Sequence, residues 1–231
     1  MIELKVKREK ITLFITEDGS HSLQVPAMGE TYHSSHGAIQ ESNHVFIKNG
    51  LEYWLRQHKK TELRIFEVGF GTGLNALLTL LKAEELDVST HYQTVELFPL
   101  EVQLTNQLNY TEQLHCNPPY FKALHTAEWG EPVAITSNFS LTKINAAFAD
   151  VATENKVDLI YYDAFAPSKQ PEMWVYKLIE KCYAMLNKNG VFVTYSAKGQ
   201  LKRDLKQAGF SVESLPGPPG KFEMVRATKD C

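Results

Sequence analysis

Cysteine is scarce in this sequence, and it has no long apolar run and no strong excess of one charge. The three cysteines, Cys116, Cys182 and Cys231, are widely spaced and form no Cys-x-x-Cys pair. This spacing predicts no disulfide framework and favours a reducing compartment. No run approaches the ~20 apolar residues of a membrane-spanning helix, and residues 1–10 lack the apolar centre of a signal peptide. We therefore expect a cytoplasmic protein without a membrane partner.

The small net charge also restricts the classes of function that the chain can have. A net charge of −3 over 231 residues argues against a general nucleic-acid binder, although it does not exclude a local basic face. This length suits one large α/β domain with a small appendage.

The first 60 residues are expected to form that appendage. Apolar and polar residues alternate over residues 2–25 around Asp18-Gly19, which predicts a short antiparallel meander. A short helix over Leu51–Gln57 would then lead into the main domain, residues 61–231.

Three histidines lie between the meander and this helix. His36 and His44 are eight positions apart, which is too far for one metal ion on a continuous helix, and no cysteine lies nearby. No metal site is predicted, and polar lining of a pocket or the start of a helix is favoured.

The central signal is the stretch from Ile65 to Asn75, in which an apolar strand runs into three glycines at alternate positions. Glycines at such a turn let the backbone bend and approach a ligand, and the helix that follows offers free N–H groups. A dinucleotide fingerprint would have its third glycine where Leu74 stands. The observed spacing, with an acid two residues before the first glycine, is instead typical of class I methyltransferases that bind S-adenosylmethionine. A glycine turn without a ligand is the alternative.

Strands and helices alternate from residue 63 onward, which predicts a mostly parallel sheet with crossover helices. The expected strands are Leu63–Val68, His91–Glu96, Val157–Tyr162 and Gly190–Tyr195. Two further strands, Phe210–Leu215 and Phe222–Ala227, would close the sheet as an antiparallel hairpin. The predicted fold is the Rossmann-like α/β fold of class I methyltransferases with a small N-terminal β appendage.

Two acids follow strands of this sheet, at the edge where open α/β sheets bind ligands. Glu96 ends the second strand and could accept hydrogen bonds from both hydroxyls of a ribose; a solvated acid is the alternative. Asp163 follows Val157–Tyr162 directly and should face the same crevice, unless it only caps a turn.

The tetrapeptide Asn117-Pro118-Pro119-Tyr120 matches the motif with which many amino-group methyltransferases hold the target nitrogen. That use requires a preceding fourth strand, and here the preceding residues are polar and helix-like. We interpret the two prolines as the end of a helix and the start of a loop.

Taken together, these stretches resemble the MnmC-like methyltransferases, which act on the wobble uridine of certain tRNAs. The resemblance covers nearly the whole chain in order, and its most specific block is Asp163-Ala164-Phe165-Ala166-Pro167 with Trp174. Other matching blocks are Tyr32–Ile47, Glu67–Asn75, Glu96–Leu100, Lys202–Leu205, Ala208–Phe210 and Lys221 with Glu223-Met224.

The resemblance implies methyl transfer from S-adenosylmethionine to the amine of 5-aminomethyl-2-thiouridine, with Asp163 as the catalytic residue. Cofactor contacts would come from Glu67, Gly69, Phe70, Gly71, Thr72, Gly73, Asn75 and Glu96. Many relatives also have a Gly-Asp pair whose acid can contact adenine; here only Asp150 could substitute for it. Many relatives carry a fused oxidase that prepares the amine. We expect a stand-alone methyltransferase domain, so a separate enzyme would have to supply the aminomethyl intermediate.

Contacts with the anticodon region of tRNA are expected from basic and aromatic residues. Phosphates could meet Lys198, Lys202, Arg203, Lys206, Lys221 and Arg226, although a solvated helix face is an equal alternative. Tyr32 or Phe165 could stack on the extruded base.

Three other functions remain open at this point. The chain could be a methyltransferase for another amine, in a small molecule or a protein. It could be a nicotinamide-dependent oxidoreductase, which Leu74 and the closing hairpin disfavour, or an RNA-binding module without catalysis.

Overall fold

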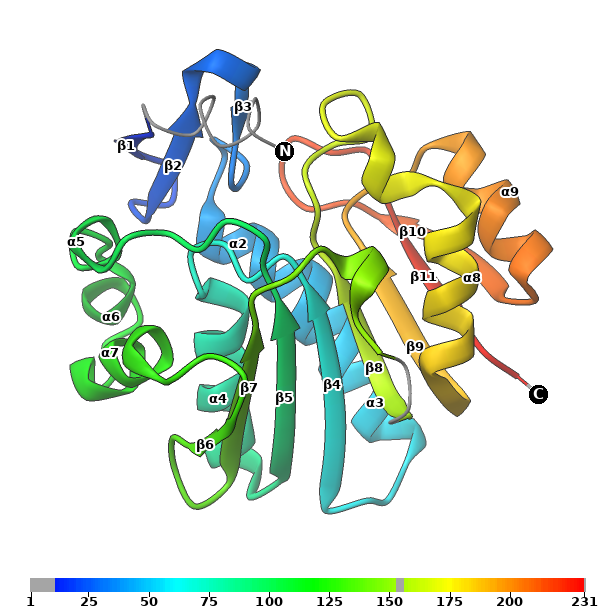
Figure 1. The fold of residues 1–231 in the computed structure, drawn as a ribbon, viewed down its shortest axis with the longest axis horizontal. Coiled ribbons are helices and arrows are strands. Elements are labelled where there is room, and N and C mark those ends of the chain that lie inside the picture. The colour runs from blue at the N-terminus through cyan, green and yellow to red at the C-terminus, as the bar shows by residue number, and fades with distance from the viewer. Residues whose placement is uncertain (1–10, 153–155, 231) are drawn as a thin grey trace.

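An eight-stranded sheet forms the centre of the molecule (Figure 1). The computed structural model describes residues 11–152 and 156–230. The strand order is β10-β11-β9-β8-β4-β5-β7-β6. The strands are β4 (Glu62–Val68), β5 (Ser89–Val95), β6 (Pro132–Ala134), β7 (Phe139–Ile144), β8 (Val157–Tyr162), β9 (Leu186–Thr194), β10 (Ser211–Pro216) and β11 (Glu223–Thr228).

The five central strands are parallel. β4 pairs with β5 and β8, β5 pairs with β7, and β8 pairs with β9. Their carboxyl ends therefore meet at one edge of the sheet. β11 pairs antiparallel with β9 and with β10, which confirms the closing hairpin, and the short β6 pairs antiparallel with β7. The predicted fold class is confirmed, with strand ends shifted by a few residues.

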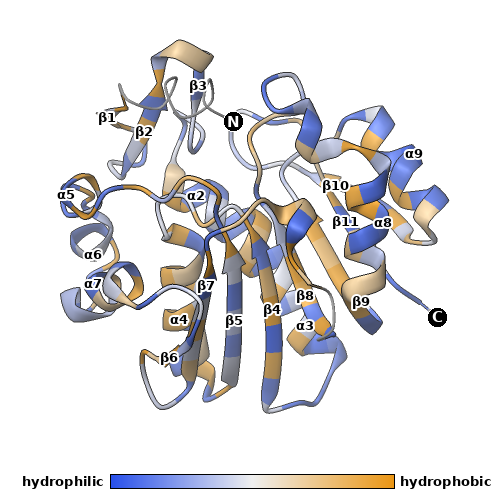
Figure 2. Cartoon of the chain, viewed as in Figure 1, coloured by the Kyte–Doolittle hydropathy of each residue, from blue (hydrophilic) through white to orange (hydrophobic). Residues whose placement is uncertain are grey.

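Each central strand contributes side chains to two cores, because successive residues of a strand face opposite sides of the sheet. Leu159 and Tyr161 of β8 belong to one core, and Ile160 and Tyr162 belong to the other. This explains why Leu159 to Tyr162 of β8 are four consecutive buried residues without a charge. In Figure 2 hydrophobic and hydrophilic positions alternate along β4 and along the helices α8 (Tyr176–Met185) and α9 (Gly199–Ala208), whereas β5 is mostly hydrophilic.

Helices cover both faces of the sheet. α4 (Leu74–Leu86) packs on one face with the helical segment between residues 38 and 57, and α8 and α9 pack on the other. The remaining helices are short: α5 (Val102–Thr105), α6 (Tyr110–Gln113), α7 (Pro118–Thr126), η3 (Phe148–Asp150) and η4 (Pro171–Trp174). Among the described residues, no helix has the length and apolar character that crossing a bilayer would need.

The N-terminal segment forms a small sheet above the carboxyl edge of the large one (Figure 1). It contains β1 (Thr12–Ile15), β2 (His21–Val25), the single turn η1 (Pro26–Met28) and β3 (Glu30–Thr31). All three strands pair antiparallel, which confirms the meander within the described residues. Its predicted start, residues 2–10, lies outside them.

The helix after the meander is much longer than the sequence predicted. α2 (Ala38–Ser42), the π-helical η2 (Asn43–Leu51) and α3 (Glu52–Gln57) follow one another without a break, whereas only Leu51–Gln57 was expected. Val45, Phe46 and Leu51 are buried on this helix, but the histidines and other polar residues between 33 and 44 interrupt the apolar pattern that would have predicted its start.

The interpretation of the double proline was partly wrong. Pro118 and Pro119 begin α7 rather than a loop, because the first helical turn needs no backbone N–H from them. The tetrapeptide lies outside the cavity described below, as its interpretation required.

Candidate functional site

A cavity of about 670 Å³ opens at the carboxyl edge of the large sheet, beneath the small N-terminal sheet. Volumes of this size are typical of small-molecule sites. The walls come from the segments 30–35, 68–72, 74–75, 95–98, 146–149 and 163–166, joined by Glu41, Gln170, Glu172, Met173, Leu178, Tyr195 and Lys221. Residues that are far apart in the sequence thus lie together around one cavity.

The glycine loop takes backbone conformations that other residues rarely adopt. Gly69 has φ of 94°, and a Cβ there would lie 2.6 Å from the backbone oxygen of Asp163. A side chain at this position would therefore push apart the ends of β4 and β8. Gly73 caps the start of α4 with φ of 75°, and Leu74 and Asn75 at the start of that helix line the cavity.

Glu96 is held in place by the glycine loop. It is 8% exposed, its Oε2 accepts the N–H of Gly71 at 3.2 Å, and its Oε1 accepts the N–H of Phe98 at 2.9 Å. The carboxylate thus stands at the tip of β5 on the cavity wall, as the sequence predicted.

Asp163 faces the cavity and is linked to a buried acid through Asn75. The Nδ2 of Asn75 donates to Oδ2 of Asp163 at 2.8 Å and to Oε1 of Glu67 at 3.1 Å. Glu67 is fully buried and also accepts the hydroxyl of Thr94 at 2.9 Å. Asn75 lines the cavity, but Glu67 and Gly73 do not. The structure therefore does not place these two predicted cofactor residues on the cavity wall.

Both acids hold their protons more tightly than ordinary carboxyls. Burial raises the pKa of Asp163 from 3.8 to about 7, and the charge of Glu41 adds to the effect. Burial, together with the charge of Asp163, raises the pKa of Glu67 to about 8. Asp163 can therefore exchange a proton near neutral pH, which is what a general base requires.

Glu41 is a site residue that sequence reasoning missed. It lies on α2, is 5% exposed, and forms an ion pair with Lys221 from the loop between β10 and β11. Its other oxygen accepts the N–H of Ser34 at 2.6 Å. The only sequence signal was its place in the Tyr32–Ile47 block, because a lone acid in a polar stretch reads as a solvated surface residue.

Tyr195 was also missed and completes this corner of the cavity. The Nζ of Lys221 lies 4.0 Å from the centre of the Tyr195 ring, and the Tyr195 hydroxyl donates to the backbone oxygen of Ala164 at 2.9 Å. The residue next to Asp163 is thereby tied to the end of β9.

Tyr32 and Phe165 meet across the mouth of the cavity. Their rings are 5.1 Å apart in an edge-to-face arrangement, and both line the cavity. Phe70 and Thr72 of the glycine loop line it as well.

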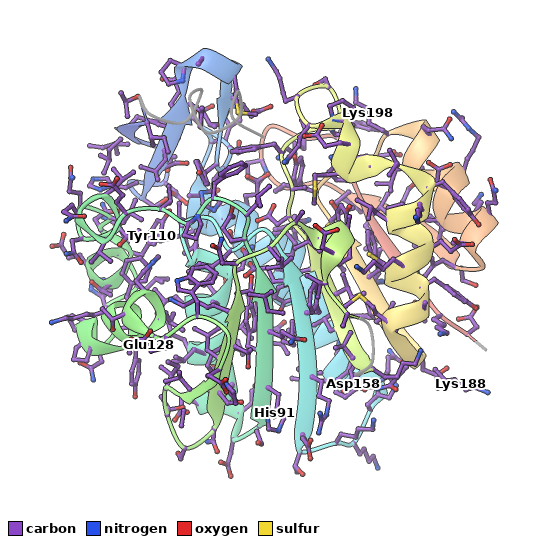
Figure 3. The ribbon with its side chains drawn as sticks, viewed as in Figure 1. His91, Tyr110, Glu128, Asp158, Lys188 and Lys198 are labelled. Atoms are coloured by element: carbon purple, nitrogen blue, oxygen red, sulfur yellow. The ribbon has the colours of Figure 1, made fainter. Side chains whose placement is uncertain are left out.

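The basic residues predicted to meet tRNA separate into two groups. Lys202 pairs with Glu223, Arg226 pairs with Glu213, and Lys221 pairs with Glu41 inside the cavity. Lys198, Arg203 and Lys206 are exposed on or beside α9. Figure 3 shows Lys198 at the end of the molecule that carries the cavity, and Lys188 at the opposite end.

Asp150 is a further predicted cofactor residue that the structure does not bring into the cavity. It is exposed at the end of η3 and borders a different hollow beside α8. The adjacent residues Ala146 to Ala149 line the main cavity instead.

The histidines between residues 33 and 44 each contact a different protein group. His33 is buried, and burial lowers its pKa to about 4, so it is neutral near pH 7. His36 faces Glu17, and the Nε2 of His44 lies 2.8 Å from the Pro216 oxygen.

Comparisons with known proteins agree with this fold. Residues 120–230 match a family model described as S-adenosyl-L-methionine-dependent methyltransferase. A crystal structure of MNMC2 from Aquifex aeolicus is 24% identical, with a TM-score of 0.75 over 94% of this chain and 70% of that one. Spermidine synthase from Thermotoga maritima has a TM-score of 0.61 at 14% identity, over 95% of this chain and 69% of that one. The class I methyltransferase fold is therefore established.

Sequence relatives carry the name tRNA 5-methylaminomethyl-2-thiouridine biosynthesis bifunctional protein MnmC. The protein from Burkholderia multivorans is 31% identical over 93% of this chain and 34% of its own length. The one from Pseudoalteromonas atlantica is 33% identical over 85% of this chain and 30% of its own length. The chain spans about a third of the length of these relatives. These matches confirm the resemblance to the MnmC-like methyltransferases.

Proposed function

We propose that this chain is an S-adenosylmethionine-dependent methyltransferase that methylates the amine of 5-aminomethyl-2-thiouridine at the wobble position of tRNA. The product would be 5-methylaminomethyl-2-thiouridine. The observation that carries this proposal is the position of Asp163, whose carboxyl group lines the same cavity as the glycine loop and Glu96. The cytoplasm is the proposed compartment, and a separate activity is proposed to supply the amine.

The residues on the cavity wall fit S-adenosylmethionine. Glu96 has an ordered carboxylate for the ribose hydroxyls, and Gly69, Gly71 and Thr72 of the glycine loop line the cavity beside it. Within the described residues, Oδ1 of Asn75 is buried without a hydrogen-bond partner, so it can accept one from the cofactor's amino group. The apolar residues Ala146 to Phe148 offer a wall for adenine. When bound, the cofactor supplies an electrophilic methyl group on a sulfonium.

Asp163 would prepare the amine. An alkyl ammonium has no lone pair with which to attack, so it must lose a proton first. A carboxyl group with a pKa of about 7 can take that proton and orient the nitrogen. Since charge only moves from sulfur to nitrogen, most of the acceleration would come from positioning.

The tRNA would approach over the open mouth of the cavity. Lys198 is exposed at the end of the molecule that carries the cavity (Figure 3), and Arg203 and Lys206 are exposed on α9, so these residues can meet phosphates. Tyr32 and Phe165 offer aromatic surfaces for the extruded base.

Incubation of the purified chain with methyl-labelled cofactor and tRNA bearing the unmethylated amine tests this function. We expect label in one wobble nucleoside, identified by nuclease digestion and mass spectrometry. The same tRNA without the aminomethyl group is the control and should stay unlabelled. Label in a small amine or a protein, with none in tRNA, would assign the chain to another acceptor.

A further inference from the structure

The corner of the cavity beside Asp163 has the composition of a binding site for a cationic amine. Glu41 supplies a carboxylate that is 5% exposed, and Tyr195 supplies an aromatic face. Asp163 lines the same cavity and is close enough for the Glu41 charge to act on it. Carboxylates and aromatic faces are the groups that bind ammonium ions in proteins.

An ammonium group already lies at this corner, and it belongs to the chain itself. The Nζ of Lys221 donates to Oε1 of Glu41 and lies 4.0 Å from the centre of the Tyr195 ring. The lysine reaches the cavity from the loop between β10 and β11, 180 positions away from Glu41 in sequence.

We propose that Glu41, Tyr195 and Asp163 form an ammonium subsite, which Lys221 fills in the free chain and the protonated amine of the substrate fills in the complex. This inference rests on the proposed function, and it names the group that selects the substrate. Glu41 would distinguish an aminomethyl group from a neutral hydroxymethyl group of similar size.

The surroundings of Lys221 allow it to leave. Its side chain is 31% exposed, and among the described residues the backbone hydrogen bonds of its loop, residues 217–222, join Gly217 to Phe222 and Lys221 to Pro218. Glu41, by contrast, is fixed by the Ser34 N–H and by its place on α2. The carboxylate therefore stays in the cavity while the lysine turns toward solvent, where RNA phosphates would receive it.

Asp163 and Glu41 have different roles in this arrangement. The substrate ammonium breaks one N–H bond and passes that proton to the carboxylate of Asp163, which leaves a neutral amine with a lone pair. Glu41 keeps the hydrogen bond from the Ser34 N–H and takes no proton from the substrate in this step. Glu41 is thus a binding residue, and Asp163 is the proton acceptor.

Binding of two free nucleosides to the chain loaded with S-adenosylhomocysteine tests the subsite. The probes are 5-aminomethyluridine and 5-hydroxymethyluridine, and the readout is the dissociation constant from ligand-observed NMR titration. We expect wild type to prefer the amine by about tenfold, since hydrogen bonds to charged groups are lost with the neutral probe. Glu41→Gln should bring this preference close to one. Lys221→Met should strengthen binding of the amine severalfold, because it removes the internal competitor.

Lys82→Met is the matched control. Lys82 is 22% exposed and paired with Glu52 and Glu85 outside the cavity, so its loss should change neither dissociation constant. Thermal midpoints and S-adenosylhomocysteine affinity show whether each variant is folded.

Results with wild type or with either variant could overturn the subsite. One is a folded Glu41→Gln variant that keeps the preference, or a wild type that shows none. The other is a folded Lys221→Met variant that binds the amine more weakly, which would make Lys221 a fixed part of the wall. The binding test uses no tRNA, so failure of methyl transfer to tRNA with an intact amine preference would reject only the proposed function.

Discussion

Asp163 combines two properties that a surface acid lacks. Its carboxyl group lines the cavity, and its pKa is raised from 3.8 to about 7 by burial and by Glu41. The donor from Asn75 fixes its orientation. A group of this kind is reversibly protonated near neutral pH, so its role can be tested by substitution and by pH.

Asp163→Asn removes the proton acceptor while keeping the size of the side chain. We expect kcat to fall by ~10²–10⁴-fold, the usual contribution of a general base, with S-adenosylhomocysteine affinity within about twofold of wild type. Single-turnover methylation and calorimetric titration give the two values. Near-normal kcat in the folded variant would remove Asp163 from catalysis.

The raised pKa of Asp163 predicts the direction in which activity and stability change with pH. The carboxylate form increases as pH rises through about 7, so kcat/KM should rise across this range in wild type. The free energy of unfolding should instead fall as pH rises. The folded chain holds the Asp163 proton between about pH 4 and 7 while the unfolded chain does not, so its contribution to unfolding free energy falls as pH rises there. Asp163→Asn should flatten this part of a stability profile measured by urea unfolding.

Substitution of Glu96 and of Asp150 tests which of these two acids contacts the cofactor. Glu96→Ala should weaken S-adenosylhomocysteine by ~10-fold or more, because charge-assisted hydrogen bonds to the ribose are lost. Asp150→Ala should leave the affinity within about twofold, since Asp150 is exposed and borders a different hollow. Calorimetric titration measures both. Comparable losses in the two variants would place the Asp150 segment against adenine after all.

At the scale of elements, the helical segment from residue 38 to 57 connects the site to the core. α2 carries Glu41 into the cavity, while η2 lies against β8 and β9. Its closest approach is at Gly50, where a Cβ would lie 3.0 Å from Cγ2 of Val193 and 3.2 Å from Cε1 of Tyr161. The packing of this helix therefore fixes the depth of Glu41 in the site.

Gly50→Leu should destabilise the fold by about 1–3 kcal/mol or more, because the added atoms have no room against the sheet. Leucine is a good helix former, so helix propensity cannot explain the loss. Lys48→Leu, at an exposed position of the same helix, is the control and should stay within about 0.5 kcal/mol of wild type. Urea unfolding compares them, and equal stability of both variants would contradict this packing.

The elements differ in how well the sequence predicted them. β4 and β8 were found with nearly correct ends, because each is an apolar run bounded by glycine or polar residues. The helix over 38–57 was mostly missed, since its buried face includes Ser42 and Gly50 beside its apolar residues. Small or polar buried residues are chosen by the surface they pack against, which local sequence does not reveal.

At the scale of the whole molecule, charge is distributed unevenly around the mouth of the cavity. The net charge is −3, yet Lys198 is exposed at the end of the molecule that carries the cavity (Figure 3). Lys188 is equally exposed but lies at the other end of the sheet (Figure 3). The two ends therefore offer a matched comparison for RNA binding.

Lys198→Glu should weaken tRNA binding severalfold and lower the slope of log affinity against log salt by about one, as expected when one phosphate contact is lost. Lys188→Glu changes the net charge equally and should have little effect. Filter binding at several salt concentrations measures both slopes. Equal effects of the two variants would mean that tRNA responds to net charge and not to this face.

The sequence by itself determined the class of the fold, the glycine turn and the positions of Glu96 and Asp163. These features depend on local patterns, namely apolar strands, glycines that need positive φ, and acids at strand ends. Only the tertiary structure decided that Glu41 and Lys221, 180 positions apart, form an ion pair beside Asp163, and that Asp150 lies elsewhere. No local sequence pattern identifies Glu41 and Lys221 as partners. Their contact arises from how the small sheet, the long helix and the closing hairpin pack around one cavity.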